Sequence, residues 1–327
     1  MHKGPDEREA YSQDRLAELA HGLDDARELL TAGGLCIYAT GSYGRLEAWE
    51  KSDIDLFFLY EDFASSSYLD FIRIASRLVE KTQEMRFPPF SGDGKYLEGL
   101  DVATMERILG SPSDDHTNTF TARMLLLLES QPISDGDRYS ELLARIVSFY
   151  YCDLPGHEAD FVPTFLVNDI LRFWRTLTLN YEHDRYRARA QADPERRERA
   201  RAKSSLKNYK LKHSRLATCF SMVAHLASEQ PPVLAERVIE LCRMTPHERF
   251  GRLQEHGDAV AGLVAELYER YEAFLHCVQR PDEELQAEFS HPEQRRARLE
   301  EAAGYGDAIF RLLTHVVPEG RMRQLVI

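Results

Sequence analysis

Residues 35–60 read LCIYATGSYGRLEAWEKSDIDLFFLY, and this stretch decides the fold of the first part of the chain. Its two ends, residues 35–40 and 53–60, are apolar runs with β-branched and aromatic side chains, which predicts two buried strands. The tetrapeptide Gly41-Ser42-Tyr43-Gly44 between them contains two glycines and predicts a turn directly after the first strand. We therefore expect a strand, a turn and a second strand within one sheet.

The regions on either side of this stretch are predicted to be mostly helical. Residues 7–30 carry apolar side chains at helical spacing and end at Gly33-Gly34, residues 65–85 predict a second helix, and residues 95–102 predict a weaker third strand. After about residue 105 the strand signals fade, and helices are expected at 120–130, 139–151, 165–186, 204–228, 233–244, 259–278 and 293–315. The expected architecture is an α+β domain with a small mixed sheet and flanking helices at residues 1–130, followed by an all-α domain at residues 131–327.

The composition is that of a globular protein of about two domains, given 327 residues and roughly 150 residues per domain. Hydrophobic residues make up 43% and charged residues 29%, which argues against a disordered chain, a collagen-like chain and a coiled-coil rod. No apolar run approaches the roughly 18 residues that span a bilayer, and residues 1–8 lead into no apolar signal core, so we expect no membrane partner. The five cysteines are scattered and form no C-x-x-C pair, which favours a reducing, cytoplasmic location over a disulfide framework or a zinc ribbon.

The formal net charge of −13 hides one strongly basic stretch. Residues 185–215 contain twelve Lys and Arg against three Asp and Glu, a local net charge of +9. A basic stretch in an acidic protein indicates a local anion site more than a general coating by nucleic acid. Its first part, residues 185–203, is low in complexity and is expected to be an exposed loop or a frayed helix extension.

The chemistry is concentrated in residues 41–56, GSYGRLEAWEKSDIDL. Gly41 lets the backbone come close to a ligand, a helix that begins there favours an anion, and Ser42 adds a hydroxyl donor. Asp53 and Asp55 stand two residues apart in a predicted strand, so both carboxylates project from the same face. Two adjacent carboxylates repel unless a cation lies between them, and hard oxygen ligands suit Mg²⁺ or Mn²⁺. A phosphate site beside a metal-binding carboxylate pair predicts phosphoryl or nucleotidyl transfer.

The pattern GSYGR-x-E followed by SDIDL resembles the signature of the DNA polymerase beta-like nucleotidyltransferase superfamily, in which G-S is followed by D-x-D. It is most similar to the branch that contains the PII-uridylyltransferases and their stand-alone bacterial relatives. A weaker likeness runs from about residue 30 to 225, through SGDGKYLEGL, DDHTNTFTARMLLLLES, FLVNDILRFWRTLTLNYE and KNYKLKHSRL.

The resemblance implies that the first domain is a nucleotidyltransferase catalytic domain. Gly41 and Ser42 would hold the β- and γ-phosphates of an NTP substrate, and Asp53 and Asp55 would ligate Mg²⁺ and take part in catalysis. The implied reaction moves an NMP from the NTP to an acceptor hydroxyl and releases pyrophosphate. The acceptor stays open between a protein, an RNA end and a small molecule, and the preferred NTP is also open.

The superfamily usually carries a third carboxylate on a later strand, where it serves as metal ligand and general base. The two leading candidates, which rank about equally, are Glu98 in KYLEGL and Asp93 in the GDG just before it, and Asp101 is the third candidate. If none of the three reaches the metal, the chain is instead expected to be a nucleotide-binding regulatory module with little or no turnover.

Basic residues are the remaining candidates for nucleotide binding. Arg45 directly follows the turn and is expected either to contact a phosphate or to pair with Glu47 or Glu50. In this superfamily a helical domain often closes the cleft and supplies cations to the triphosphate. The matching residues here are Lys207, Lys210, Lys212 and Arg215. The alternative for these four is a solvated helix face.

Overall fold

The computed structural model describes residues 4–26, 30, 34–61, 67–90, 94 and 97–326. By their contacts these residues form two compact units, and the first combines the chain up to residue 161 with residues 232–245. The second unit combines residues 162–231 with residues from 246 onward. The protein is a mixed α+β chain, in which a small sheet lies in the first unit and helices make up most of the rest. The first unit therefore extends past the predicted boundary at residue 130.

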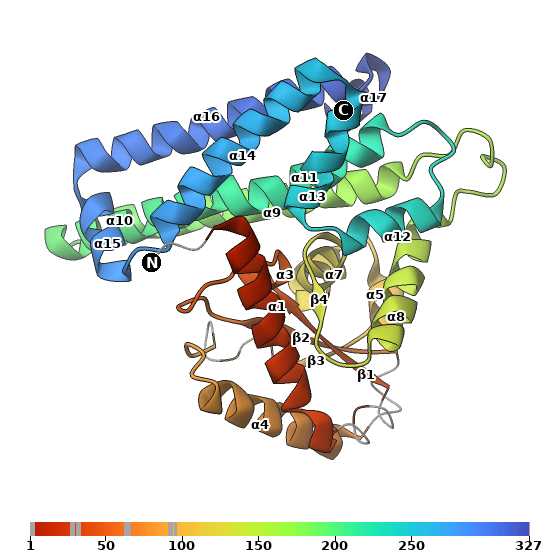
Figure 1. Ribbon diagram of the computed structural model, residues 1–327, viewed down its shortest axis with the longest axis horizontal. Helices are drawn as coiled ribbons and strands as arrows, with labels where there is room; N and C mark the ends of the chain where they lie inside the picture. Colours follow the sequence, from red (N-terminus) through yellow and green to blue (C-terminus); the bar gives the residue numbers. More distant parts are fainter. Residues whose placement is uncertain are drawn as a thin grey trace. The chain divides into compact units, whose positions relative to one another are not determined.

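The described residues contain one mixed sheet of four strands, in the order β3-β2-β1-β4 (Figure 1). The strands are β1 (Leu35–Thr40), β2 (Asp55–Tyr60), β3 (Gly99–Asp101) and β4 (Gln131–Pro132). Strand β1 pairs antiparallel with β2 and with β4, whereas β2 and β3 are parallel. The antiparallel register places Thr40, the last residue of β1, opposite Asp55, the first residue of β2.

The strand predictions hold to different extents. The bounds of β1 are confirmed, and β2 begins at Asp55 instead of residue 53. Strand β3 is shorter than the predicted 95–102, and residues 95 and 96 lie outside the described residues. Strand β4 was not predicted, because two residues ending in a proline carry no strand pattern.

Helices α1 (Pro5–His21) and α4 (Tyr68–Glu84) cover one face of the sheet. Alternate residues of the strands, such as Ile37 and Phe58, point to this face and form one apolar core with residues of both helices, such as Leu19. The predicted helix at 7–30 is shorter in the structure, since α1 ends at His21 and a short 3₁₀ helix, η1 (Asp24–Ala26), follows.

Helices α7 (Asn118–Leu128) and α8 (Gly136–Ser148) lie against the other face. Tyr38 of β1 stacks on Phe57 of β2 with ring centroids 5.5 Å apart, and its hydroxyl donates to the carbonyl of Ala122 in α7. The residues of β1 and β2 that point to this face include Thr40 and Asp55, so the end of α7 reaches the same edge of the sheet.

The remaining helices that the structure describes in the first unit are α3 (Gly41–Gly44), α5 (Val102–Ile108), α6 (Pro112–His116), η4 (Phe149–Tyr151) and α12 (Ala235–Arg243). A buried ion pair joins α6 to α7, because both guanidinium nitrogens of Arg123 donate to Asp114 at 2.7 and 2.9 Å. Arg123 also donates to the hydroxyl of Tyr150 at 2.9 Å, so its charge and hydrogen-bonding groups are satisfied inside the protein.

All regular secondary structure in the described residues of the second unit is helical. Its elements are α9 (Thr164–Arg189), α10 (Pro194–Lys210), a π-helical turn η5 (Leu211–Arg215), α11 (Leu216–Ser228), α13 (Pro246–Arg252), η6 (Leu253–His256), α14 (Asp258–Val278), α15 (Asp282–Ser290), α16 (Pro292–Val316) and α17 (Glu319–Val326). Helix α10 packs against α9, α15 and α16, around a core that includes Tyr209, Phe274 and Phe289.

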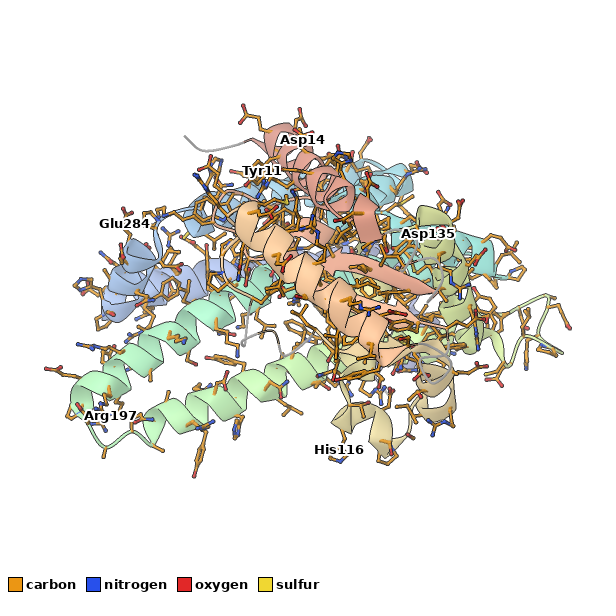
Figure 2. The ribbon with its side chains drawn as sticks, turned by 90° about the horizontal axis from the view of Figure 1, so that it is seen from below. Tyr11, Asp14, His116, Asp135, Arg197 and Glu284 are labelled. Atoms are coloured by element: carbon orange, nitrogen blue, oxygen red, sulfur yellow. The ribbon has the colours of Figure 1, made fainter. Side chains whose placement is uncertain are left out.

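The basic stretch at 185–203 is helical except at residues 190–193, so the prediction of an exposed loop is wrong for most of it, whereas residues up to 189 do extend the preceding helix. Helix α9 continues to Arg189, and α10 begins at Pro194 after a short turn. Asp193 caps α10 by accepting hydrogen bonds from the backbone of Glu195 and Arg196, which explains why a highly charged sequence begins a helix here. The two helices form a hairpin, and Figure 2 shows Arg197 near its tip. Of the helices that the structure describes, none combines the length and the apolar character that crossing a membrane requires.

Candidate functional site

The turn after β1 and the start of β2 lie against each other. Gly41 begins α3 with φ +69°, a left-handed conformation that favours glycine. A Cβ atom at Gly41 would lie 2.9 Å from Oδ2 of Asp55, closer than a real Cβ contact allows. The antiparallel pairing of Thr40 with Asp55 produces this approach, since it sets the first residue of the turn beside the first residue of β2. The two halves of the sequence motif therefore meet at one edge of the sheet.

The residues of SDIDL alternate as the sequence predicts. Ile54 is fully buried, whereas Asp53 is exposed and Asp55 is half-buried. The buried Ile54 anchors the start of β2 in the core and leaves both neighbouring carboxylates on the accessible side. Carboxylate oxygens are the donors that Mg²⁺ and Mn²⁺ prefer, and the missing side chain of Gly41 leaves open the space beside Asp55. The donor set at this edge thus fits a hard divalent cation.

Glu129 is a site residue that the sequence analysis missed. It follows the last residue of α7, and its side chain is fully buried. Its Oε1 accepts a hydrogen bond from the backbone N–H of Gly41 at 3.2 Å, and its Oε2 lies 2.7 Å from Nη1 of Arg45. Glu129 therefore holds the turn through the backbone N–H of Gly41, one of the two residues expected to hold the phosphates.

Arg45 is engaged by carboxylates on two sides. Besides Glu129, its Nε donates to Oε1 of Glu47 at 2.6 Å, and both side chains are mostly buried. Of the two roles expected for Arg45, the structure has the pairing with Glu47, in a buried setting and with a second partner. Its positive charge compensates the buried Glu129, and this fixes the segment that follows the turn.

Two further contacts hold the turn in place. A Cβ atom at Gly44 would lie 2.2 Å from the carbonyl oxygen of Glu129, so only glycine permits the backbones to approach so closely. The second contact is made by Tyr43, the residue before Gly44. It is buried, and its ring contacts Phe87 edge-on at a centroid distance of 5.5 Å. Burial raises the pKa of the Tyr43 phenol above its usual value, and its hydroxyl hydrogen-bonds with Tyr11 and Arg15, so neutral Tyr43 anchors the turn.

Among the residues that the structure describes, no third carboxylate forms a metal-binding group with Asp53 and Asp55. Oε1 of Glu98 accepts a hydrogen bond from Nδ2 of Asn118 at 2.6 Å. Asp101 accepts from the backbone N–H of Thr104 at 2.6 Å and so caps α5. It also lies opposite Tyr60, five residues and about 16 Å along β2 from Asp55. The other leading candidate, Asp93, lies outside the described residues.

No group of three or more His, Cys, Asp or Glu side chains that could hold a metal ion occurs in the described parts of the chain. The first unit therefore offers a pair of carboxylates at this edge, Asp53 and Asp55, and a third protein ligand stays a prediction. Ser42 is half-buried at the second position of the turn and directly follows Gly41.

The predicted basic residues belong to the second unit. Lys207 pairs with Asp184 of α9 at 2.5 Å, and Lys210 is exposed at the end of α10. Lys212 and Arg215 lie in the π-helical turn η5, where the spacing of an α-helix no longer applies, so they do not continue the face of α10. A contact of these four residues with a nucleotide stays a prediction.

A signal for Glu129 was present in the sequence. It directly follows four leucines in MLLLLES, and a carboxylate at the end of a buried apolar run needs a partner. The sequence offered no way to choose that partner, because Arg45 lies 84 residues away along the chain.

Comparisons with known proteins place the chain in no family. No protein-family model matches the chain, and neither a curated protein nor a solved structure matches it.

Proposed function

We propose that the protein is a Mg²⁺-dependent nucleotidyltransferase that moves an NMP from an NTP to an acceptor hydroxyl. The observation that carries this proposal is the close approach of Gly41 to the carboxylate of Asp55. A turn without a side chain, set directly against a carboxylate pair, is the arrangement that a phosphate chain and its metal ions require. The resemblance of residues 41–56 to the superfamily signature agrees with it.

The roles follow from the contacts of each residue. Asp53 and Asp55 would hold the metal, and a bound Mg²⁺ would neutralise the triphosphate and activate the acceptor hydroxyl. Gly41 contributes open space, since its N–H already donates to Glu129, and we assign the hydroxyl of Ser42 to a phosphate oxygen. In the reaction the acceptor hydroxyl gives up its proton to solvent, its oxygen bonds to the α-phosphorus, and the bond from that phosphorus to the pyrophosphate oxygen breaks.

The test compares two double variants that each remove two negative charges from the first unit. Asp53→Asn with Asp55→Asn alters the proposed metal ligands, and Asp14→Asn with Asp137→Asn alters exposed residues of α1 and α8. Each protein is incubated with the four NTPs labelled at the α-phosphate, Mg²⁺ or Mn²⁺, and a cell extract. We expect the wild type and the exposed-residue variant to label an acceptor, and the ligand variant to lose more than about 100-fold in rate. Equal labelling by all three proteins would refute the proposal.

The acceptor class follows from the labelled product. Protease digestion would release the label from a protein, RNase would release it from an RNA end, and resistance to both would indicate a small molecule. A net charge of −13 argues against broad affinity for nucleic acid, which usually needs an extended basic surface.

A second candidate is a nucleotide-binding regulatory module with little turnover. The observation that favours it is that Glu98 and Asp101 each have another partner, Asn118 and the N-terminus of α5. Without a general base the rate would fall by about 10²- to 10⁴-fold, while nucleotide binding would be kept. Calorimetry that shows tight, Mg²⁺-dependent NTP binding without pyrophosphate release over hours would support this candidate, and steady pyrophosphate release would exclude it.

A further inference from the structure

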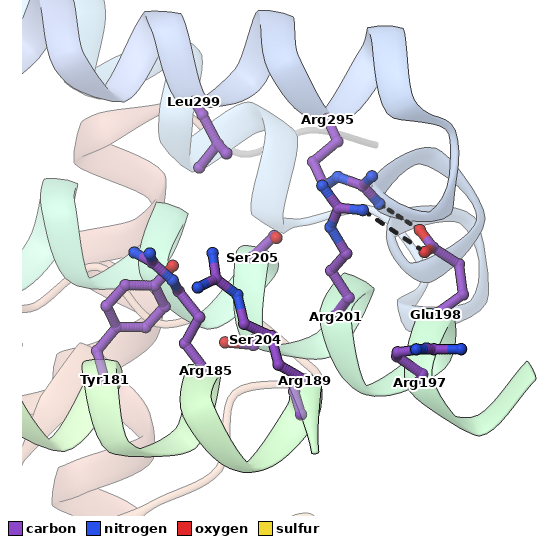
Figure 3. A pocket seen from close by; sticks show the side chains of 11 residues that line it. Tyr181, Arg185, Arg189, Arg197, Glu198, Arg201, Ser204, Ser205, Arg295 and Leu299 are labelled. Atoms are coloured by element: carbon purple, nitrogen blue, oxygen red, sulfur yellow. Dashed lines mark hydrogen bonds and ion pairs between the residues drawn. The ribbon is translucent and has the colours of Figure 1, made fainter. Parts of the chain in front are cut away.

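A pocket of about 580 Å³ lies within the second unit, between α9, α10 and α16 (Figure 3). Tyr181 of α9 and Leu299 of α16 lie toward one end of the view, and Arg197 of α10 lies toward the other. The volume is within the range of about 300–1,000 Å³ that is typical of small-molecule sites. All of its lining residues come from the second unit, so the pocket is distinct from the site at Gly41 and Asp55.

The lining of this pocket is strongly cationic. Its charged members are Arg185, Arg189, Arg197, Arg201, Arg295 and a single acid, Glu198. These six side chains carry a net charge of +4, although the whole chain carries −13. Arginine presents a planar fork of donors that matches phosphate oxygens, and five such groups around one cavity favour a ligand with several phosphate charges.

Carboxylates of the second unit form ion pairs with some of these arginines but not with all of them. Glu198 pairs with the buried Arg295 at 2.6 Å and lies 3.9 Å from Arg201, and Arg185 pairs with Glu182 of α9 at 2.9 Å. Among the described residues, Arg189 and Arg197 have no carboxylate within ion-pair distance. The two unpaired guanidinium groups come from different helices, one from the end of α9 and one from the start of α10. Both side chains are exposed, which leaves their positive charges available to an anion in the pocket.

Ser204 supplies a second, independent observation. It lines the pocket from α10 and is only 8% exposed. Its Oγ is buried and has no hydrogen-bond partner within the part of the chain that the structure describes. A buried hydroxyl without a partner is unfavourable, and a ligand oxygen in the pocket would satisfy it.

We propose that this pocket binds a polyphosphorylated small molecule of nucleotide size, independently of metal ions. The arginines receive its phosphates, Ser204 donates to one of their oxygens, and Tyr181 and Leu299 cover its less polar part. This inference goes beyond the proposed function and does not depend on it.

The experiment uses the full chain and removes metal-dependent binding elsewhere. Isothermal titration calorimetry is performed on the Asp53→Asn/Asp55→Asn protein in EDTA, with inorganic tripolyphosphate, with ATP and with GTP as separate probes. The pocket variant Arg189→Ala/Arg197→Ala is compared with Arg196→Ala/Arg199→Ala, which removes two exposed arginines of α10 that do not line the pocket. Both variants lose two positive charges, so a general charge effect would be equal in the two.

We expect at least one probe to bind, the pocket variant to weaken binding by at least about 10-fold, and the exposed-arginine variant by less than about 2-fold. Ser204→Ala serves as a second variant, since it should weaken binding by about threefold or more without lowering the melting temperature of the free protein. Absence of binding by every probe, or equal weakening by both arginine variants, would overturn the proposal. A single-stranded RNA that binds where the small probes do not would also overturn it. Loss of transferase activity bears only on the first site, so the two proposals can fail separately.

Discussion

Replacement of Glu129 by alanine should destabilise the first unit strongly. The fully buried carboxylate accepts from the N–H of Gly41 at 3.2 Å and pairs with Arg45 at 2.7 Å. Its removal takes one carboxylate partner from a buried guanidinium, which keeps Glu47, and takes the acceptor away from a backbone N–H. Breaking a buried ion pair by removing one partner costs about 3–5 kcal/mol of the free energy of unfolding. Because Glu47 still compensates Arg45 in part, we expect a loss of about 3 kcal/mol.

Glutamine at the same position should cost less. Its side-chain oxygen can still accept from Gly41, but it cannot neutralise Arg45, so the expected loss is about 1–2 kcal/mol. Glu141→Ala is the matched control, because Glu141 is exposed on α8 and pairs with Arg138 at the surface. Such a surface pair contributes at most about 1 kcal/mol.

The assay must report on the first unit alone, since the chain has two units. The protein contains two tryptophans, Trp49 in the first unit and Trp174 in the second. In a Trp174→Phe background, the fluorescence of Trp49 during urea unfolding follows the first unit. A loss below about 1 kcal/mol for Glu129→Ala, or an equal loss for Glu141→Ala, would refute the role assigned to Glu129.

Two further predictions concern the turn and the second unit. Gly41→Ala should cost about 1–2 kcal/mol for its left-handed backbone and should also displace the carboxylate of Asp55. Gly34 is the control, because its backbone has a similar φ of +61° but a Cβ atom there would make only ordinary contacts. In urea unfolding and label incorporation, Gly34→Ala should therefore lose stability but keep NMP transfer. Equal transfer activity of the two variants would contradict this prediction. Burial lowers the pKa of His213 from 6.5 to about 4, so the unfolded state binds more protons between these values, and stability should fall as the pH falls, by about 2 kcal/mol at about pH 5. His213→Phe, which keeps the stacking on Phe274, should remove this part of the pH dependence in urea titrations, and an unchanged pH profile would show that His213 does not cause it.

The sequence predicted the local elements of the site well because their signals are local. The run LCIYAT became β1 at the predicted bounds, and the alternation around Ile54 matched its burial. Hydrophobic periodicity also located the long helices of the second unit, since each helix buries one face in a core such as that around Tyr209. Element ends were less accurate, because capping contacts such as that of Asp193 decide them.

The parts that failed depend on contacts between distant residues. The bond from Gly41 to Glu129 joins residues 88 positions apart, and no periodicity in either segment encodes it. The basic stretch at 185–203 was misjudged because its charge suggested a loop, whereas pairing of α9 with α10 gives it a helical partner. The unit boundary moved for the same reason, since residues 232–245 return to the first unit only through tertiary packing.

The charges of the two proposed sites have opposite signs, and this gives each a different dependence on metal. At the first site, Asp53, Asp55, Glu47 and Glu129 outnumber Arg45, so these five side chains carry a net charge of −3. A triphosphate is repelled by such a site, and only divalent cations held by Asp53 and Asp55 can reverse the sign of the interaction. The pocket of the second unit carries +4 in its lining and attracts phosphates without metal. Chelation should therefore abolish nucleotide binding at the first site and leave binding at the second unchanged.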